Sequence, residues 1–280
     1  KSSFWERFFF LKKYNFLFYL TDGSIFYSTA KNNIIHFQVP FENIYKSFWS
    51  SIKLSRWKMA IYNSRFTKEL VEKSWPIKGL VIYPPVSVDT FKPLKKKKQI
   101  ISVGRFAGHI RSKKHFVLID TFNKLGKKDW SLHLVGGTNE GDRDYINDLK
   151  KMAKGLDVYF YENLELKNLA KLYGESSIYW HAAGFEETDP KKMEHFGIST
   201  VEAMAAGCVP IVINLGGQTE IVEHGKSGFL WNTKEELVDY TLRVIMDGNL
   251  QRRLSQEAVQ RSRMFSKDRF YQQIKEIVYG

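Results

Sequence analysis

Two glutamates, Glu194 and Glu202, lie eight residues apart in the stretch EHFGISTVEAMAAGCVP, on either side of a glycine. Gly197 permits a tight turn before a helix, so the amides of Gly197, Ile198 and Ser199 can face a ligand. The partial positive charge of a helix start attracts phosphate, which glutamates would repel. Carboxylates instead accept hydrogen bonds from sugar hydroxyls. The stretch therefore predicts a site for a ligand that carries both phosphates and hydroxyls, such as a nucleotide sugar.

A purely structural interpretation of the same stretch is a capping box. Ser199 and Glu202 have the spacing with which two side chains satisfy backbone donors at the start of a helix, here expected at 200–207. This interpretation explains Glu202 but leaves Glu194 and Gly197 without a role.

A second candidate loop, in VGRFAGHIRSKKHFVLID, contains two cations after an expected strand. Gly104 allows the backbone to approach a ligand closely, and we expect Arg105 and Lys113 to lie over the strand ends. Two fixed cations suit a diphosphate, because arginine binds phosphate oxygens as a fork and lysine binds them as a point charge. Taken alone, the pair is better explained as ordinary surface cations, so the interpretation depends on the glutamate stretch.

Alternating strands and helices are expected to position these loops. Six β-rich runs occupy residues 99–103, 130–135, 157–161, 177–182, 209–214 and 227–231, with helical segments between them. This alternation predicts an α/β fold with a parallel sheet and helices on both faces. Ligands bind outside the carboxyl ends of such strands, where the two candidate loops would lie.

The rest of the chain is less regular. Strands are expected within 34–40, 58–66 and 80–86, with a helix at 66–75, which together resemble the back half of another α/β domain. The lysine run 95–98 follows a proline and predicts a solvated linker. Two helical segments, at 249–263 and 267–278, close the chain.

Positive charge and aromatic residues are concentrated in the first third. Residues 1–98 contain 18 Lys and Arg against 6 Asp and Glu, whereas the remaining residues contain 25 against 24. The same third holds 22 of the 42 aromatic residues. A basic, aromatic surface suits nucleic acid or anionic membrane headgroups, and the structural alternative is an aromatic core under a solvated face.

Other features of the sequence narrow the function classes. No apolar run is long enough to span a bilayer, and the single Cys208 excludes an internal disulfide. No Cys/His or carboxylate cluster has the spacing of metal ligands, so we expect no essential metal and no other cofactor. The chain lacks an initiator methionine, and we expect it to begin inside a longer protein.

Taken together, the motifs resemble the retaining glycosyltransferases of family four, which have the GT-B fold. EHFGISTVEAMAAGCVPIV is similar to their E-x7-E signature, and VGRF…KKHFVLIDTF is similar to their donor-phosphate loop. GGQTEIVEHGKSGFLW resembles the stretch after the signature, and YNSRFTKELVEKSW…VIYPPVSVDTF resembles the end of the first domain. The likeness runs from about residue 20 to the C-terminus. The Tyr-Pro-Pro and His-Phe-Gly forms are similar to enzymes that extend lipid-linked or surface polysaccharides.

The resemblance implies a role for each matching residue. Arg105 and Lys113 match the pair that holds the donor diphosphate and stabilises the leaving group. Glu194 matches the residue that binds the hydroxyls of the donor sugar, and Glu202 the one that binds the ribose. The remaining donor-binding positions are Gly104, Phe196, Gly197, Ile198 and Ser199, the last four in the segment whose backbone amides meet the sugar and phosphates.

Two further positions either allow a second interpretation or depart from the family pattern. His36 lies where the family often has a histidine near the reacting sugar, and a buried core histidine explains it equally well. Lys114 stands where the family usually has glycine, which puts the geometry of the phosphate loop in doubt.

The resemblance also implies a domain plan and a reaction. Residues 1–92 would be the C-terminal part of an N-terminal, acceptor-side Rossmann-like domain whose first hundred or so residues are absent. Residues 93–262 would be the nucleotide-sugar domain, and 263–280 a helix that crosses back. The whole enzyme would move a sugar from a UDP- or GDP-linked donor to a glycan or lipid-linked acceptor with retention of configuration. We expect this protein in the cytoplasm, peripheral at the inner face of the membrane, and expect the fragment by itself to be weakly active or inactive.

Three other functions are alternatives to a glycosyltransferase. A nucleic-acid-binding protein would use the basic first third, but no recognised motif supports it and the two glutamates stay unexplained, so we expect no nucleic acid partner. A nucleotide-sugar hydrolase or phosphorylase of the same fold would release the sugar to water or phosphate. A catalytically dead sensor is disfavoured by the intact set of arginine, lysine and glutamates.

Overall fold

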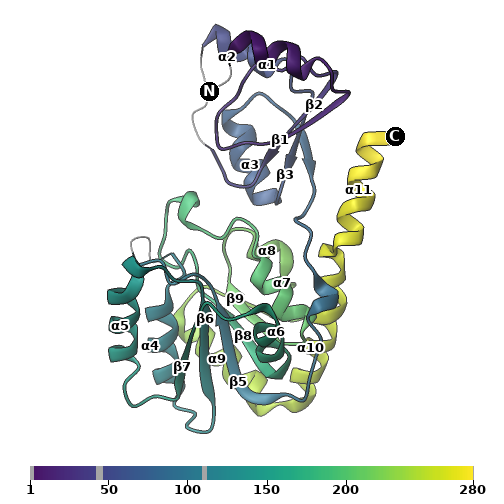
Figure 1. Cartoon of the computed structure of the whole chain (residues 1–280). Coiled ribbons are helices and arrows are strands. Elements are labelled where there is room, and N and C mark those ends of the chain that lie inside the picture. The colour runs from purple at the N-terminus through teal and green to yellow at the C-terminus, as the bar shows by residue number, and fades with distance from the viewer. Residues whose placement is uncertain (1–2, 42–46, 109–111, 280) are drawn as a thin grey trace. The chain divides into compact units, whose positions relative to one another are not determined.

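The computed structural model describes residues 3–41, 47–108 and 112–279, drawn in Figure 1. These residues form two compact units, one of Lys1–Pro84 with Phe270–Gly280 and one of Pro85–Arg269. Each unit is built on a parallel β-sheet with helices packed against it, so the expected α/β class is confirmed.

The larger unit contains a six-stranded sheet in which every pair of neighbours is parallel. Its strands are β5 (Lys97–Val103), β6 (Ser131–Gly136), β7 (Val158–Glu162), β8 (Ser176–His181), β9 (Val209–Ile213) and β10 (Phe229–Trp231). All six expected strands are present, within two residues at each end. Strands β6, β8 and β9 have no exposed residue, as their apolar sequences indicate for strands covered on both faces.

The strand order β10-β9-β8-β5-β6-β7 places a topological switch in the middle of this sheet. The chain proceeds from β5 outward to β6 and β7, and then returns to β8 on the other side of β5. Ligands bind at such a switch point, outside the carboxyl ends of the two diverging strands. The segments that follow β5 and β8 are the two loops that the sequence singled out.

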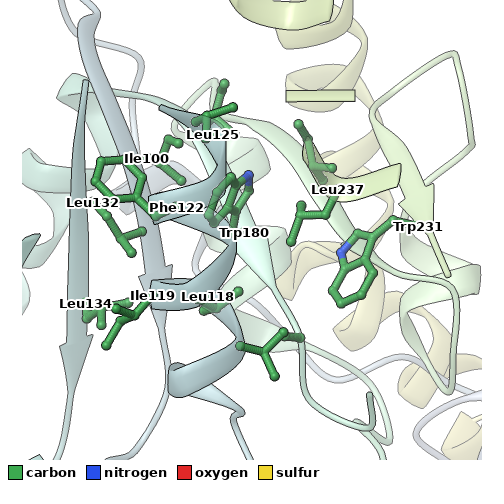
Figure 2. Close-up of a cluster of buried hydrophobic side chains, with 14 of the residues drawn as sticks. Ile100, Leu118, Ile119, Phe122, Leu125, Leu132, Leu134, Trp180, Trp231 and Leu237 are labelled. Carbon is green, nitrogen blue, oxygen red and sulfur yellow. The ribbon is translucent and has the colours of Figure 1, made fainter. Parts of the chain in front are cut away.

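The described part of the larger unit also contains α-helices α4 (His115–Leu125), α5 (Arg143–Met152), α6 (Leu166–Glu175), α7 (Ile198–Ala205), α8 (Gln218–Ile221), α9 (Lys234–Met246) and α10 (Gly248–Ser262). Figure 2 shows how the core forms between sheet and helices: Trp180 of β8 and Leu132 of β6 lie among apolar side chains of α4, including Phe122. The Trp180 indole donates a hydrogen bond to Thr241 of α9, which satisfies its buried N–H.

The lysine run does not form a linker, contrary to the expectation. Lys97 begins β5, and Lys96 is largely buried. The ammonium of Lys96 donates to the carbonyl oxygens of Ser176 and Ala206, each at 2.7 Å. These carbonyls lie at the C-terminal ends of α6 and α7, where a cation is stabilised by the helix dipoles. Lys96 is therefore part of the fold of the larger unit.

The smaller unit contains the parallel sheet β1-β2-β3-β4, formed by β1 (Phe16–Leu20), β2 (Asn32–Phe37), β3 (Met59–Tyr62) and β4 (Gly79–Val81). Its helices are α1 (Phe4–Leu11), α2 (Phe48–Leu54), α3 (Arg65–Ser74) and most of α11 (Lys267–Tyr279). Three apolar residues of α11 pack against buried isoleucines of the sheet, among them Ile34 and Ile61. The sequence did not predict α1 or β1, because the short apolar runs before residue 34 fit neither period clearly.

The compact units divide at Pro84/Pro85 and Arg269/Phe270, whereas the sequence placed the divisions at 92/93 and 262/263. Residues 85–92 belong to the larger unit because the Val86 amide donates to the Phe265 carbonyl oxygen at 2.9 Å and Val88 is buried. Within the described residues, no helix combines the length and apolar character needed to cross a bilayer.

Candidate active site

The two candidate loops of the larger unit meet at the topological switch. Lys113, in the segment after β5, places its ammonium 2.5 Å from the Oε2 atom of Glu194, in the segment after β8. The two residues are 81 positions apart in the chain. The fold thus brings together a cation suited to phosphate and a carboxylate suited to hydroxyls, as the sequence predicted from their separate loops.

The Glu194 carboxylate is held by two donors in a mostly buried position, with 19% of its side chain exposed. Besides Lys113, the Nε2 atom of His181 lies 3.2 Å from the same Oε2 atom. Burial by itself favours the protonated acid, but the Lys113 cation and the His181 hydrogen bond outweigh it and hold the pKa of Glu194 well below its ordinary value. Glu194 is therefore an anion at every physiological pH and can accept hydrogen bonds.

Glycines at the ends of β5 and β6 allow these two strand ends to pack closely. A Cβ atom on Gly104 would lie 2.8 Å from Cγ of Lys113, and one on Gly136 would lie 2.1 Å from the Gly104 carbonyl oxygen. The Gly104 amide donates to the Val135 carbonyl oxygen, which continues the β5–β6 ladder by one residue. A larger residue at position 136 would push the backbone of Gly104 away, and one at position 104 would displace the Lys113 side chain.

Arg105 differs from Lys113 in having no side-chain partner among the described residues. Its side chain is exposed, and within the described residues it makes no side-chain hydrogen bond or ion pair. Its Cγ atom lies 3.8 Å from the position of a Cβ atom on Gly137, so the side chain starts alongside the loop after β6. The guanidinium group is accordingly available for an anionic ligand.

Lys114 takes the backbone conformation for which glycine is usually required. It is the N-cap of α4 and has φ 53° and ψ 39°, in the left-handed region. Its ammonium lies 2.6 Å from Oε1 of Glu187, in the segment after β8, and both side chains are largely buried. The left-handed turn therefore forms with lysine at this position, and its ion pair adds a second link between the two loops.

The capping-box interpretation of Ser199 and Glu202 is wrong. Helix α7 begins at Ile198, with Gly197 as its N-cap at φ 119°, so Glu202 lies in the middle of the helix. Its carboxylate accepts a hydrogen bond from the Tyr173 hydroxyl at 3.4 Å, while the Ser199 hydroxyl pairs with that of Tyr179 at 2.9 Å. Glu202 is thus free of any backbone role at the helix start.

The first turn of α7 has the expected donors. The amides of Ile198 and Ser199 have no intrahelical carbonyl partner, because the first N–H groups of a helix lack one. Ile198 is about half exposed, whereas Phe196 is buried and packs against Phe265 with ring centroids 5.6 Å apart. Phe196 therefore anchors the turn in the core, and the following amides can face a ligand.

Glu202 has an electrostatic environment opposite to that of Glu194. Burial raises the pKa of Glu202 to about 7, and the hydrogen bond from Tyr173 opposes this shift only in part. No cation lies within salt-bridge distance of its carboxylate among the described residues. The two signature glutamates differ accordingly: Glu194 is a fixed anion, and Glu202 changes charge near neutral pH.

His36 belongs to β2 of the smaller unit and is buried, with 5% of its surface exposed. Burial lowers its pKa to about 4, so the imidazole is neutral. Its Nδ1 atom has no hydrogen-bond partner in the described part of the chain, and its ring lies 5.6 Å from that of Phe18. The burial agrees with a core histidine, and a role near the reacting sugar stays a prediction.

Sequence reasoning missed several polar residues around Glu194. His181 is the last residue of β8, and the buried Gln218 accepts a hydrogen bond from Thr200 at 2.9 Å. A Cβ atom on Gly197 would lie 2.4 Å from Nε2 of Gln218, which explains why the turn needs glycine. His181 could have been found, because it ends an apolar run directly before the singled-out loop. Gln218 carries no such signal. Across the described ranges, no group of three or more His, Cys, Asp or Glu side chains could hold a metal ion.

Known proteins share this fold. A glycosyltransferase from Rickettsia africae superposes with a TM-score of 0.74 at 22% identity, covering 89% of this chain and 70% of the other. Alr3699/HepE from Anabaena, in complex with UDP and glucose, has a TM-score of 0.73 at 20% identity, covering 89% and 71%. These similarities establish the GT-B type of α/β fold.

Curated relatives are similar in sequence. The GDP-Man:Man(3)GlcNAc(2)-PP-Dol alpha-1,2-mannosyltransferase of Dictyostelium discoideum is 29% identical over 235 residues, which cover 75% of this chain and 43% of that protein. The human protein of the same name is 29% identical over 246 residues, covering 79% and 47%. The human alpha-1,3/1,6-mannosyltransferase ALG2 is 29% identical over 196 residues, covering 61% and 45%. The chain spans less than half the length of these relatives.

The family described as "Glycosyl transferases group 1" matches residues 88–261, a range that contains the Lys113–Glu194 contact, Arg105 and the whole of α7. The match covers more than half of the chain. The chain belongs to the glycosyl transferases group 1 family.

Proposed function

We propose that the protein containing this chain transfers a sugar from a nucleotide sugar to a lipid-linked glycan, with retention of the anomeric configuration. The observation that carries the proposal is the contact of Lys113 with Glu194 at the switch point. A cation that could bind a diphosphate and a carboxylate that could bind sugar hydroxyls lie together there, shortly before the start of α7. Arg105 belongs to the same segment after β5 and has no side-chain partner among the described residues. A nucleotide sugar is a ligand that has both groups.

GDP-mannose is the proposed donor, and an oligosaccharide on a lipid diphosphate is the proposed acceptor. Two relatives that match three quarters or more of this chain carry GDP-Man and a PP-Dol-linked glycan in their names. A UDP-linked donor is the alternative, because the similar Alr3699/HepE was solved with UDP and glucose. An assay that compares the two donors distinguishes them.

The proposed reaction forms a bond from an acceptor hydroxyl oxygen to the anomeric carbon and breaks the bond from that carbon to the diphosphate. The hydroxyl proton passes to the leaving phosphate oxygen on the same face of the sugar. Negative charge grows on that phosphate, where Arg105, Lys113 and the first amides of α7 would stabilise it. Glu194 would hold the sugar hydroxyls and Glu202 the ribose. No carboxylate acts as nucleophile, and no metal is part of the proposal.

Membrane contact is the second part of the proposal, since a lipid-linked acceptor lies at a membrane surface. Helix α1 of the smaller unit exposes Phe4, Trp5, Phe9 and Phe10 by more than half of their surface, with Lys12 and Lys13 directly after it. Aromatic rings settle at the headgroup level, and lysines attract anionic lipid. We propose that this unit binds the cytoplasmic face of a membrane peripherally.

Ligand-induced stabilisation of the full-length protein tests the donor. We expect GDP-mannose at about 100 times its Kd to raise the free energy of unfolding by about 2.7 kcal/mol. GDP at about 100 times its own Kd should raise it by the same amount. Transfer is then measured with a lipid-linked acceptor. Stabilisation by no nucleotide sugar would contradict the proposal. Release of the sugar without an acceptor would point to a hydrolase, and salt-dependent binding to duplex DNA alone would point to a nucleic-acid-binding protein.

A further inference from the structure

His181 is a buried histidine beside the site to which neither the sequence motifs nor the comparisons assign a role. It ends β8 and has 3% of its side chain exposed. Its backbone is fixed on one side by pairing with Val212 of β9, and its carbonyl oxygen accepts a hydrogen bond from the Trp231 indole at 3.2 Å. The imidazole therefore has little freedom to move.

The hydrogen bond to Glu194 determines the tautomer of this imidazole. The Nε2 atom of His181 lies 3.2 Å from Oε2 of Glu194, and an ionised carboxylate only accepts hydrogen bonds. The amide nitrogen of Gln218 lies 3.5 Å from the same Nε2 atom and could donate only to an unprotonated ring nitrogen. The contact with the Glu194 carboxylate is shorter and involves a full negative charge, so it determines the proton position. Nε2 therefore carries the proton, which leaves Nδ1 as an unprotonated acceptor. In the described chain Nδ1 has no hydrogen-bond partner, and burial lowers the pKa of His181, so the ring stays neutral.

Both donors of Glu194 bind the same oxygen. Lys113 and His181 contact Oε2, while Oε1 has no hydrogen bond from any described residue. Two donors at one oxygen fix the plane of the carboxylate and leave the lone pairs of the other oxygen unused. The side chain of Glu194 is partly exposed, so Oε1 can be reached by a ligand.

The two donors are not equivalent when a donor substrate binds. Lys113 has a flexible side chain, and its cation is needed by the diphosphate in the proposed reaction. If the ammonium moves toward phosphate, its bond to Glu194 lengthens or breaks. His181 is rigid, neutral and buried, and it keeps its hydrogen bond in both states.

We infer that His181 is a positioning residue, which holds Glu194 through Oε2 so that Oε1 is presented to the hydroxyls of the donor sugar. The inference rests on the proposed nucleotide-sugar function. It assigns His181 to recognition of the sugar and not of the nucleotide. Loss of this hydrogen bond should therefore weaken binding of a nucleotide sugar while leaving the affinity for the nucleoside diphosphate unchanged.

Two polar substitutions in the full-length protein separate positioning from packing. The amide nitrogen of His181→Gln lies near the place of Nε2 and can still donate to Glu194, whereas that of His181→Asn lies near Nδ1 and cannot. Calorimetry with GDP-mannose and GDP is the measurement. For His181→Asn we expect a loss of about tenfold or more in GDP-mannose affinity, the effect of losing a hydrogen bond to a charged group, with less than about twofold change for GDP. His181→Gln should recover most of the loss.

A matched control is His133→Asn, in β6 of the same sheet. His133 is also buried, with 4% exposed, and its ring nitrogens form hydrogen bonds with the hydroxyls of Ser131 and Tyr161. We expect a comparable loss of stability without any selective loss of GDP-mannose affinity. Equal weakening of GDP and GDP-mannose by His181→Asn, or no weakening of either, overturns the inference.

A measurement on the wild-type protein covers the case in which the variants do not fold. Nitrogen-15 histidine spectra should show His181 as the neutral Nε2–H tautomer from pH 6 to pH 8, and the Nδ1–H tautomer would overturn the inference. These outcomes differ from failure of the proposed function. In that case the wild type itself would bind no nucleotide sugar, while the tautomer would still be observed.

Discussion

The ammonium of Lys114 lies 2.6 Å from Oε1 of Glu187, across 73 residues of sequence. Only 13% of the lysine side chain and 20% of the glutamate side chain are exposed, and the lysine holds the pKa of the carboxyl below its ordinary value. Lys192 lies 3.5 Å from the other oxygen of Glu187. A lysine in a left-handed backbone position thus connects the phosphate loop to the segment that carries Glu194.

Replacing Lys114 tests how backbone strain and this ion pair combine. Lys114→Ala loses the ion pair and keeps a left-handed residue with a Cβ atom, whereas Lys114→Gly loses the pair but relieves the strain. We expect the alanine variant to be less stable than the glycine variant by about 1 kcal/mol, measured by urea unfolding. Equal stabilities would show that the backbone at residue 114 carries no strain.

Glu194→Ala in the full-length enzyme should lower turnover at least about a hundredfold, as expected when positioned hydrogen bonds near the reacting centre are lost. Glu175→Ala is the matched control, because Glu175 has the same 19% exposure and a lysine partner at 2.7 Å, but lies at the C-terminus of α6. It should keep wild-type turnover. Wild-type kinetics for Glu194→Ala would refute its assigned role.

Arg105 and Lys113 should respond differently to replacement by alanine. Arg105 has no ion-pair partner within the described residues, so Arg105→Ala should lower kcat/KM about tenfold or more without loss of stability. Lys113→Ala should lower both, because among the described residues it leaves the mostly buried Glu194 carboxylate with His181 as its one remaining donor. Enzyme kinetics and urea unfolding provide the two measurements.

Lys98→Ala is the control for removal of a cation, since Lys98 pairs with Asp129 at 2.5 Å on an exposed surface. We expect it to change neither quantity appreciably. Full activity in the folded fraction of Arg105→Ala would contradict its phosphate role, and unchanged stability of Lys113→Ala would contradict the importance of its contact with Glu194.

The sequence predicted the architecture of the larger unit and the meeting of its two loops for a physical reason. Runs such as VPIVI are short, rich in β-branched residues and uninterrupted by polar residues, which is typical of strands covered on both faces. Once the sheet is parallel, its loops must gather at one edge, so Lys113 and Glu194 were expected near each other. The local sequence pattern thus predicts the strands, and the parallel topology then determines where their loops lie.

The features that the sequence did not predict depend on contacts between distant residues. In the sequence, Lys96 cannot be distinguished from the three other lysines of the run 95–98. It is largely buried and donates hydrogen bonds because the fold places the carbonyl oxygens of Ser176 and Ala206 next to it. The capping box was a local prediction that failed because Gly197 starts the helix two residues earlier than expected, through its left-handed conformation. His181 gains its importance from Glu194, 13 residues later.

The raised pKa of Glu202 gives a pH dependence with a definite sign. The carboxyl has an ordinary value of 4.5 and a value of about 7 in the folded protein, so its contribution to stability is fully present below pH 4.5 and is lost as the pH rises through about 7. Glu202→Gln removes this titration. We expect the free energy of unfolding of the variant, measured in urea, to increase relative to that of the wild type as the pH rises from about 5 to about 8. A difference between the two proteins that does not change with pH would contradict the raised pKa.

Donor affinity should also depend on the ionisation of Glu202, and it should increase with pH whereas stability decreases. If Glu202 binds the ribose hydroxyls as a carboxylate, GDP-mannose affinity should rise from pH 6 to pH 8 in the wild type and stay flat in Glu202→Gln, because the diphosphate of a nucleotide sugar does not titrate in this range. Calorimetry at several pH values measures both. A pH-independent affinity in the wild type would separate Glu202 from the ribose.

The last prediction concerns the exposed aromatic residues of α1. Trp5 is 65% exposed and Phe9 is 60% exposed, and the two rings lie 6.4 Å apart, so they form one apolar surface next to Lys12 and Lys13. We expect the full-length protein to float with vesicles that contain anionic lipid at low salt and to dissociate as salt rises, because the attraction of each lysine is about 1 kcal/mol and is screened.

Replacement of both rings, Trp5→Ser with Phe9→Ser, should abolish flotation, whereas Leu166→Ser should not. Leu166 is the matched control because it is 59% exposed and lies in the larger unit. Charge reversal of Lys12 and Lys13 should weaken flotation without changing donor affinity, since neither lies in the unit that holds Glu194. Binding that persists in the double serine variant would place the membrane contact elsewhere. Absence of wild-type flotation at low salt would exclude the membrane part of the proposal and leave a soluble acceptor as the substrate to be sought.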